Sequence, residues 1–434
     1  MKQLLPLSVV VVQIIFLVLS PAFSQEKNEI DLSQILKEVE KKSFSIGGFL
    51  EFQPSLVGLD RDSVFYKLKF PDQGPNTTSQ YNFGLRLEGR YEKRAVGLHF
   101  TADSLLKRDL QGWDNRISLF EGYLSWRLGP RFTLDAGKKT TKWGKGYAWN
   151  PVAFIDRPKN PEDPLEALEG FYVLSADITR SFGGPLKTLA LTPVLVPVTK
   201  DINSSFGKHN HLNFGGKLYF LLWDSDIDFL FLTGASRSNR FGFDLSRNLK
   251  SNLEVHAEWA WLTDSVKTEF DQDGQVFTTV SDVTKMLLGL RYLTASETTF
   301  IVDYYHNGSG FEQQEYEDII MREENPVPAP PNMTVNRSNP SLLPLLGTPN
   351  PMRNYLYFRT SQKEPFDILY LTPELTSIFN LDDGSFQLMP GTTYSPQTNL
   401  QMRLRGIFMV GNEFTEFGEK QADYRIEFRV RYFF

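Results

Sequence analysis

Large apolar residues occupy every second position over most of this chain. Near the C-terminus, Ile426, Phe428 and Val430 alternate with the charged residues Glu427 and Arg429. The same alternation marks stretches far apart in the chain, including 81–91, 253–261 and 400–410. A period of two places successive side chains on opposite faces, so these stretches are predicted to be β-strands with one apolar and one polar face.

About 18 such runs follow one another, each about 9–13 residues long, which matches the length of a tilted strand that crosses a bilayer. Strands of ordinary globular proteins are shorter, at about 5–6 residues. The runs begin near Phe44, Tyr81, Ala95, Ile117, Arg131, Gly170, Leu186, His211, Asp226, Asn239, Asn252, Val283, Glu297, Met352, Ile368, Gly384, Thr398 and Ala422.

The connections between the runs alternate between tight and long almost throughout. Tight connections are predicted at 91–94, 128–131, 182–186, 223–226, 249–252, 294–297 and 395–398. Long connections are predicted at 55–80, 105–116, 138–169, 199–210, 263–282, 308–351 and 411–421. Short turns at one rim and long loops at the other are the pattern of a bacterial outer-membrane barrel.

These patterns predict an all-β fold over residues 44–434: a closed, transmembrane, antiparallel β-barrel of about 18 strands, within a range of about 16–18. The sheet must close because lipid offers no partner to an unpaired backbone group. A soluble sandwich or propeller is the alternative. Its strands would be shorter, and a propeller would show a repeat of about 40–50 residues, which this sequence lacks.

The N-terminal part precedes the predicted barrel. Residues 1–24 combine a lysine, an apolar run and small residues at Ala22 and Ser24, which is typical of a cleaved signal peptide. Residues 25–43 carry an apolar stripe at helical spacing, which predicts a short amphipathic helix in the periplasm. The stripe consists of Leu32, Ile35, Leu36 and Val39.

The terminal strand, "ADYRIEFRVRYFF", resembles the last strand of Gram-negative outer-membrane β-barrels of the porin-like type. Like them, it alternates apolar and charged residues and ends on an aromatic residue, Phe434. The resemblance implies a location in the bacterial outer membrane, contact with its lipid, and recognition of this strand by the barrel-assembly machinery.

Composition narrows the function further. The chain contains no cysteine, which excludes disulfides, thiolate metal sites and cysteine nucleophiles. Its formal charge of −6 does not favour nucleic acid as a partner. We find no catalytic motif, no cofactor motif and no convincing metal site, since His209 and His211 stand without clear acidic neighbours in sequence. The sequence therefore does not predict an enzyme.

The connection 138–169 holds the most distinctive motif, W-G-K-G-Y-A-W-N-P from Trp143 to Pro151. It resembles motifs of several porin-like barrels. We expect an ordered loop that folds into the lumen as a constriction or solute platform; an external loop made rigid by its own aromatic residues is the alternative. The residues expected to form the constriction are Lys142, Trp143, Lys145, Tyr147, Trp149, Asp156 and Arg157.

The polar faces of the strands predict the residues that line the pore. Arg86, Arg90, Arg403, Arg405, Arg425, Arg429 and Arg431 form a predicted basic wall, whereas Glu121, Asp135, Glu254 and Glu258 lie on a more acidic one. The last two strands place five arginines but only one acidic residue, Glu427, on the lumen face. This predicts a local positive excess and a weak preference for anions. Pairing of lumen charges between neighbouring strands is the alternative.

The function expected from these features is a porin-like outer-membrane channel for passive diffusion of small polar or anionic solutes. The alternative is a structural or assembly barrel that anchors a periplasmic or surface partner, including the sheath of an electron conduit. The sequence leaves a homo-oligomer or a periplasmic partner open.

Overall fold

The computed structural model describes residues 43–70, 74–270, 276–324 and 348–434. The predicted signal peptide, almost all of the predicted N-terminal segment and the middle of the connection 308–351 lie outside these residues. No helix of the described part is long and apolar enough to cross a membrane.

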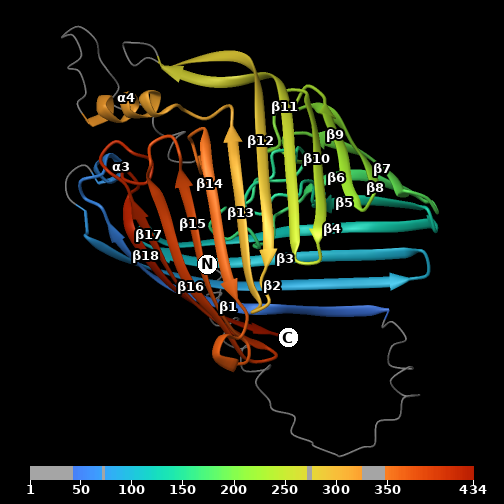
Figure 1. The fold of residues 1–434 in the computed structure, drawn as a ribbon, viewed down its shortest axis with the longest axis horizontal. Helices are drawn as coiled ribbons and strands as arrows, with labels where there is room; N and C mark the ends of the chain where they lie inside the picture. The colour runs from blue at the N-terminus through green and yellow to red at the C-terminus, as the bar shows by residue number, and fades with distance from the viewer. Residues whose placement is uncertain (1–42, 71–73, 271–275, 325–347) are drawn as a thin grey trace, which may run out of the picture. The chain divides into compact units, whose positions relative to one another are not determined.

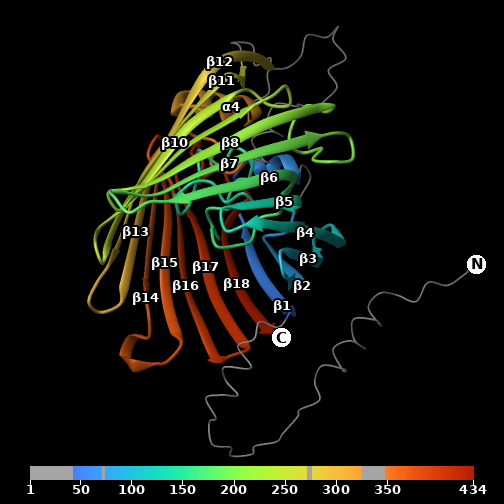
Figure 2. The same ribbon diagram turned by 90° about the vertical axis from the view of Figure 1, so that its right-hand side faces the viewer.

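Eighteen antiparallel strands form one closed sheet (Figure 1). Each strand pairs with the next along the chain, and the last pairs with the first, so the strands follow one another around the barrel (Figure 2). The strands are β1 (Phe44–Leu59), β2 (Thr77–Lys93), β3 (Val96–Asp109), β4 (Gly112–Gly129), β5 (Phe132–Lys139), β6 (Phe171–Ser181), β7 (Leu186–Val198), β8 (His211–Leu222), β9 (Ser225–Thr233), β10 (Arg240–Lys250), β11 (Leu253–Phe270), β12 (Val276–Leu293), β13 (Thr298–Asn307), β14 (Asn354–Gln362), β15 (Leu371–Asn380), β16 (Phe386–Gln397), β17 (Leu400–Val410) and β18 (Ala422–Phe433).

The predicted fold class is confirmed, and most strands begin within a few residues of the expected position. The largest differences are at β4 and β12, which begin earlier than expected, at Gly112 and Val276. The predicted loop 105–116 is wrong, because β3 continues to Asp109 and only Leu110 and Gln111 separate it from β4. The predicted loop 263–282 is likewise largely strand, since β11 continues to Phe270.

The alternation of side chains decides what faces outward. On β18, Ile426 is 42% exposed and Phe428 is 40% exposed, whereas Glu427 between them is 8% exposed. Outward apolar side chains need no partner in lipid, while the charged side chains are paired in the lumen. The orientation predicted from the alternation is therefore the one that the barrel adopts.

Barrel closure depends on the two ends of the described chain. Phe49 lies opposite Phe433 in the β1–β18 pairing. Phe434 and Gly48 exchange two backbone hydrogen bonds of 3.1 Å each. The start of β1 and the end of β18 are therefore at the same rim as the tight connections, which we call the turn rim; the long connections form the opposite loop rim.

Two helices at the loop rim were not predicted. Helix α3 (Val64–Lys69) begins after Ser63, whose hydroxyl accepts a hydrogen bond of 3.1 Å from the N–H of Tyr66. Helix α4 (Gln313–Glu324) buries Tyr316, Ile319 and Ile320, a spacing that places all three on one helical face. A short 3₁₀ turn at Pro365–Asp367 follows β14.

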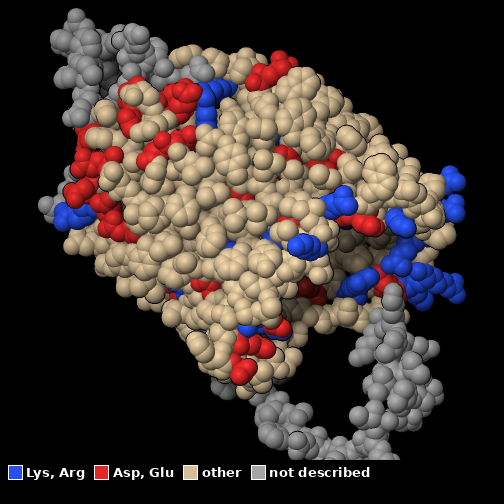
Figure 3. All heavy atoms as spheres, viewed as in Figure 1, with Lys and Arg blue, Asp and Glu red and all other residues tan. Residues whose placement is uncertain are grey.

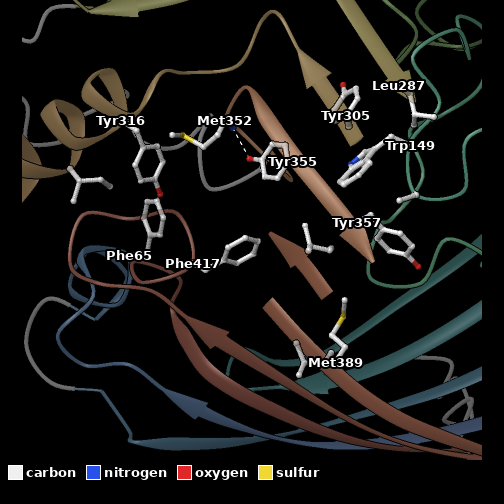
Figure 4. Close-up of a cluster of buried hydrophobic side chains, with 14 of the residues drawn as sticks. Phe65, Trp149, Leu287, Tyr305, Tyr316, Met352, Tyr355, Tyr357, Met389 and Phe417 are labelled. Atoms are coloured by element: carbon white, nitrogen blue, oxygen red, sulfur yellow. Dashed lines mark hydrogen bonds between the residues drawn. The ribbon is translucent and has the colours of Figure 1, made fainter. Parts of the chain in front are cut away.

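The buried apolar residues gather inside the barrel rather than between stacked sheets. Figure 4 shows one cluster, in which Tyr316 of α4 and Phe65 of α3 lie near Phe417, while Trp149 lies among tyrosines of β13 and β14. Tyr355 on β14 accepts a hydrogen bond of 2.7 Å from the N–H of Met352 there. The helices and the connection between β5 and β6 are thus packed onto the inner wall of the barrel.

Candidate functional site

The connection between β5 and β6, residues 140–170, is the central feature of the lumen, and we call it the lumen loop. It contains no strand or helix. Gly144 has a φ of +95°, and a Cβ there would come within 2.4 Å of Asn150 Nδ2 and 2.8 Å of Glu258 Oε1. Only glycine therefore fits where the loop meets the wall.

Internal hydrogen bonds give the lumen loop its shape. The carboxylate of Asp156 accepts hydrogen bonds from the N–H of Thr141 at 2.6 Å, its hydroxyl at 2.7 Å and the N–H of Trp143 at 3.1 Å. Lys159 Nζ donates to the carbonyl of Gly146 at 2.7 Å. Burial lowers the pKa of Lys159. These contacts satisfy backbone groups that have no strand or helix to pair with.

One carboxylate on β11 anchors the middle of the loop. Glu258, only 2% exposed, accepts hydrogen bonds from the N–H groups of Lys145 and Gly146, both at 2.6 Å. It also accepts from Asn150 Nδ2 and from the N–H of Val152, both at 3.2 Å. A buried carboxylate that accepts several N–H groups is strongly held, because charge-assisted hydrogen bonds are among the stronger ones in proteins.

Strand β13 supplies a second anchor. Asp303 Oδ2 accepts the N–H groups of Tyr147 at 2.9 Å and Ala148 at 3.1 Å, while its Oδ1 lies 2.9 Å from His256 Nε2. Next to this contact, the Trp149 ring stacks on Tyr305 with 5.0 Å between centroids. The W-G-K-G-Y-A-W-N-P motif is therefore fixed to the wall by its backbone and by its second tryptophan.

An ion pair continues the attachment toward β9 and β10. Lys145 Nζ lies 3.0 Å from Asp228 Oδ2 and 3.7 Å from Asp244 Oδ1. These two aspartates face each other in the β9–β10 pairing, and Asp244 faces Glu258 in the β10–β11 pairing. Burial opposes the charge on Lys145, but the carboxylates of Asp228 and Asp244 outweigh it and raise the pKa of Lys145.

Acidic residues farther along the loop reach the opposite wall. Asp163 Oδ2 lies 2.8 Å from Arg403 Nη1 and 3.2 Å from Arg429 Nη1. Glu162 pairs with Arg425, and its carbonyl accepts a hydrogen bond of 2.7 Å from Arg405 Nη1. Burial opposes the charge on both acids, but these arginines prevail and lower the pKa values of Glu162 and Asp163.

The predicted positive excess of this wall is corrected by these contacts. Besides the two loop acids, Glu374 of β15 lies 2.9 Å from Arg403 Nη2, and Glu51 of β1 pairs with Arg431. Glu427 lies 2.7 Å from Arg405 Nη2. The count from the last two strands alone missed carboxylates from other strands and from the loop, which reach the arginines only in the closed barrel.

The other predicted pore-lining residues are also mostly paired. Arg86 pairs with Asp103 through two hydrogen bonds. Glu121 accepts the N–H of Thr140 at 3.0 Å. Three further contacts involve predicted lining residues: Asp135 with Lys139, Glu254 with the hydroxyl of Tyr147, and Arg90 with Glu92 near the turn rim.

The remaining predicted loop residues differ in exposure. Trp143 is 3% exposed and packs in an apolar cluster with Val152, Phe154 and Ile155. Arg157 lies over the ring of Phe171 at 4.7 Å. Lys142 is exposed and lines a cavity. The inner wall next to this cluster is apolar, because side chains of the lumen loop cover it. The lumen is therefore not polar throughout.

Two cavities described here adjoin the lumen loop. One of about 560 Å³ is lined by residues that include Arg86, Glu88 and Lys142. The other, of about 210 Å³, is lined by residues that include Arg359, Glu374 and Arg403. Leu165 and Glu166 line both, so this end of the loop lies between the two spaces.

Several residues of this site were missed from the sequence. Asp228 and Asp244 lie on inward positions that the alternation could have identified. Glu162 and Asp163 belong to the loop segment already singled out, but their partners lie more than 200 positions away, so no local signal indicated them. Within the described residues, no group of three or more His, Asp or Glu side chains is arranged to hold a metal ion.

No family model and no curated protein matches the chain. Among solved structures, it is similar to Pseudomonas aeruginosa OpdQ, with a TM-score of 0.52 and 11% identity over 91% of this chain and 98% of that one. It is also similar to Pseudomonas aeruginosa OccK5 (OpdH), with a TM-score of 0.50 and 13% identity over 90% and 98%. At such identities the likeness is one of fold, and it covers nearly the whole barrel.

Proposed function

We propose that this protein is a porin-like channel of the bacterial outer membrane, through which small polar or anionic solutes diffuse passively. The observation that carries the proposal is a closed barrel of 18 strands whose charged lumen is narrowed, but not filled, by its own loop. Barrels of about 16–18 strands are wide enough for an aqueous channel. The proposal requires no catalytic step.

The lumen loop accounts for the selectivity that such a channel needs. It is attached to β11 and β13 at one side and to β17 and β18 at the other, so solutes pass beside it. The adjoining cavities, of about 560 and 210 Å³, suit small solutes. Because the arginines of β17 and β18 have carboxylate partners, we expect the anion preference to be weak.

The alternative of a barrel that anchors a partner is less well supported. A sheath around another polypeptide requires a free lumen, whereas here the loop and the helices of the loop rim pack inside the barrel. A partner bound at either rim remains compatible with the channel. The lumen contacts therefore favour diffusion of solutes over enclosure of a protein.

Reconstitution into planar bilayers tests the proposal. We expect discrete conductance steps from the purified, refolded protein, and fractionation of the native protein with outer membranes. Its gel mobility should change on boiling, since closed barrels resist detergent until heated. Release as a soluble periplasmic protein, or a folded and inserted barrel that never conducts, would contradict the proposal.

A further inference from the structure

Exposed basic side chains gather on one part of the turn rim. We define the basic rim patch as Lys93, Arg94, Arg131, Arg180 and Lys187, which belong to or flank three successive tight connections, β2–β3, β4–β5 and β6–β7. All five are exposed, and none forms an ion pair or a side-chain hydrogen bond with another described residue. The blue atoms at the right-hand edge of Figure 3 lie over these strand ends.

The patch borders the surface that faces lipid. Arg180 lies on the same face of β6 as Leu174 and Ile178, which are 41% and 42% exposed. By the same alternation, Lys93 shares the outward face of β2 with Tyr91. These cations therefore stand at the edge of the apolar band rather than in the lumen.

Exposed aromatic residues lie at the same height. Trp126 on β4 is 47% exposed, and Tyr91 on β2 and Phe182 after β6 are each 37% exposed. The guanidinium of Arg180 lies over the ring of Phe182 at 5.1 Å. Aromatic side chains beside basic ones are typical of the boundary between hydrocarbon and headgroups.

The charge is uneven around the rim. Next to the patch, Glu92 is held by Arg90 and Arg127, so it does not neutralise the outward cations. Across the barrel, the β14–β15 connection places Glu364 and Asp367 next to Lys363, and the β16–β17 connection holds no charged residue. Among the described residues, the longest row of unpaired cations on the turn rim thus spans these three connections, and Arg247 and Lys250 form a shorter one at the β10–β11 connection.

We propose that the basic rim patch binds the phosphate headgroups of anionic phospholipids in the leaflet at the turn rim. The inference rests on the proposed membrane position of the barrel. Lysine and arginine are attracted to an anionic membrane surface, and arginine matches phosphate oxygens with paired N–H donors. Phospholipid phosphates supply the negative charges that the protein itself does not place next to these cations.

Lipid retention tests the proposal. The purified protein is placed in phosphatidylcholine membranes with a minority of phosphatidylglycerol and is then re-extracted in detergent. Native mass spectrometry identifies and quantifies the lipid that remains bound. We expect phosphatidylglycerol to be enriched at least about fivefold over its share of the membrane, and the enrichment to fall as salt screens the phosphate contacts.

Two variants decide where the lipid binds. Replacement of all five patch residues by Gln should abolish the enrichment. The control replaces five exposed bases near the loop rim, Arg61, Arg108, Arg116, Lys200 and Lys208, by Gln and should retain it. Equal enrichment in the patch variant, equal loss in the control, or salt-insensitive enrichment in the wild type would each overturn the proposal.

Conductance, recorded on the same samples, separates this inference from the proposed function. A patch variant that conducts normally without phosphatidylglycerol enrichment supports both. A wild type that conducts but shows no enrichment overturns the lipid site alone. A wild type that retains phosphatidylglycerol but never conducts overturns the channel alone. If the wild type retains purified lipopolysaccharide rather than phosphatidylglycerol, the assigned leaflet is wrong and the proposal fails.

Discussion

The backbone N–H of Gly146 donates a hydrogen bond of 2.6 Å to Oε1 of Glu258. The two residues are 112 positions apart, and their contact joins the middle of the lumen loop to the inner face of β11. The same carboxylate accepts hydrogen bonds from three other groups of the loop. This buried carboxylate therefore holds the middle of the lumen loop against the wall of the barrel.

Removal of the Glu258 carboxylate should release this part of the loop. Each buried N–H group left without an acceptor costs about 1–3 kcal/mol, so the Glu258→Ala variant should favour a detached loop. We expect a higher and noisier single-channel conductance, measured in planar bilayers. As a control, Glu254→Ala removes the contact with the Tyr147 hydroxyl and a 4.0 Å ion pair with Arg291 but no hydrogen bond to the loop backbone, and it should leave the conductance nearly unchanged. Identical traces from all three proteins would show that Glu258 does not hold the loop.

Neutralising the acids at the other attachment should change ion selectivity. In the double variant Glu162→Gln, Asp163→Asn, the arginines of β17 and β18 lose two carboxylate partners. We expect the reversal potential in a salt gradient to shift toward anions at low salt. The shift should fade as the Debye length drops below about 8–10 Å.

A matched variant separates local charge from total charge. Glu317→Gln with Asp318→Asn removes two charges from helix α4, remote from the arginines of β17 and β18, and should move the reversal potential less. If both double variants shift it equally, the loop acids do not set the field of the lumen.

The attachments that Glu162, Asp163 and Lys145 make should be insensitive to pH around neutrality. The arginines lower the pKa values of Glu162 and Asp163, so their contribution is present above the ordinary carboxyl range of about 4 and is lost only as pH falls through the lowered values. The pKa of Lys145 is raised, so its ion pairs persist through neutral pH and are lost only above the ordinary lysine value of about 10.4. We expect the ion selectivity that the contacts of Glu162 and Asp163 set, measured as the reversal potential, to be constant from about pH 5 to 9.

That measurement should be made on a Glu166→Gln background. Burial and the neighbouring Asp163 raise the pKa of Glu166, so its own charge changes above the ordinary glutamate range. With Glu166 replaced, a step in the reversal potential between neutral and mildly acidic pH would mean that the contacts of Glu162 and Asp163 are weaker than the ion pairs indicate.

The terminal aromatic residue should matter for assembly. Phe434 is 48% exposed on the outside of the barrel, and its backbone pairs with Gly48. We expect Phe434→Ser to keep these backbone bonds but lower the heat-modifiable yield in outer membranes, because the strand loses the aromatic end that the assembly machinery is proposed to recognise. Phe434→Tyr should assemble normally. If Phe434→Ser assembles with full yield, the backbone pairing is sufficient for closure of the barrel and the aromatic ring is not needed.

Period-two alternation by itself determined the strands of this protein and the face of each strand that meets lipid. A strand's two faces are set by neighbouring positions in the chain, so Ile426 and Glu427 carry that information locally. The tight connections determined which rim holds the chain ends, since an even number of crossings returns the chain to its starting side.

Only the tertiary structure decided what the lumen contains. The pairs Asp163–Arg429 and Gly146–Glu258 join residues that closure of the barrel brings together, and no spacing in the sequence encodes them. The arginines of β18 therefore appeared unpaired in the sequence and are neutralised in the fold. Strand identity depends on local sterics, whereas charge balance depends on which distant groups share one enclosed space.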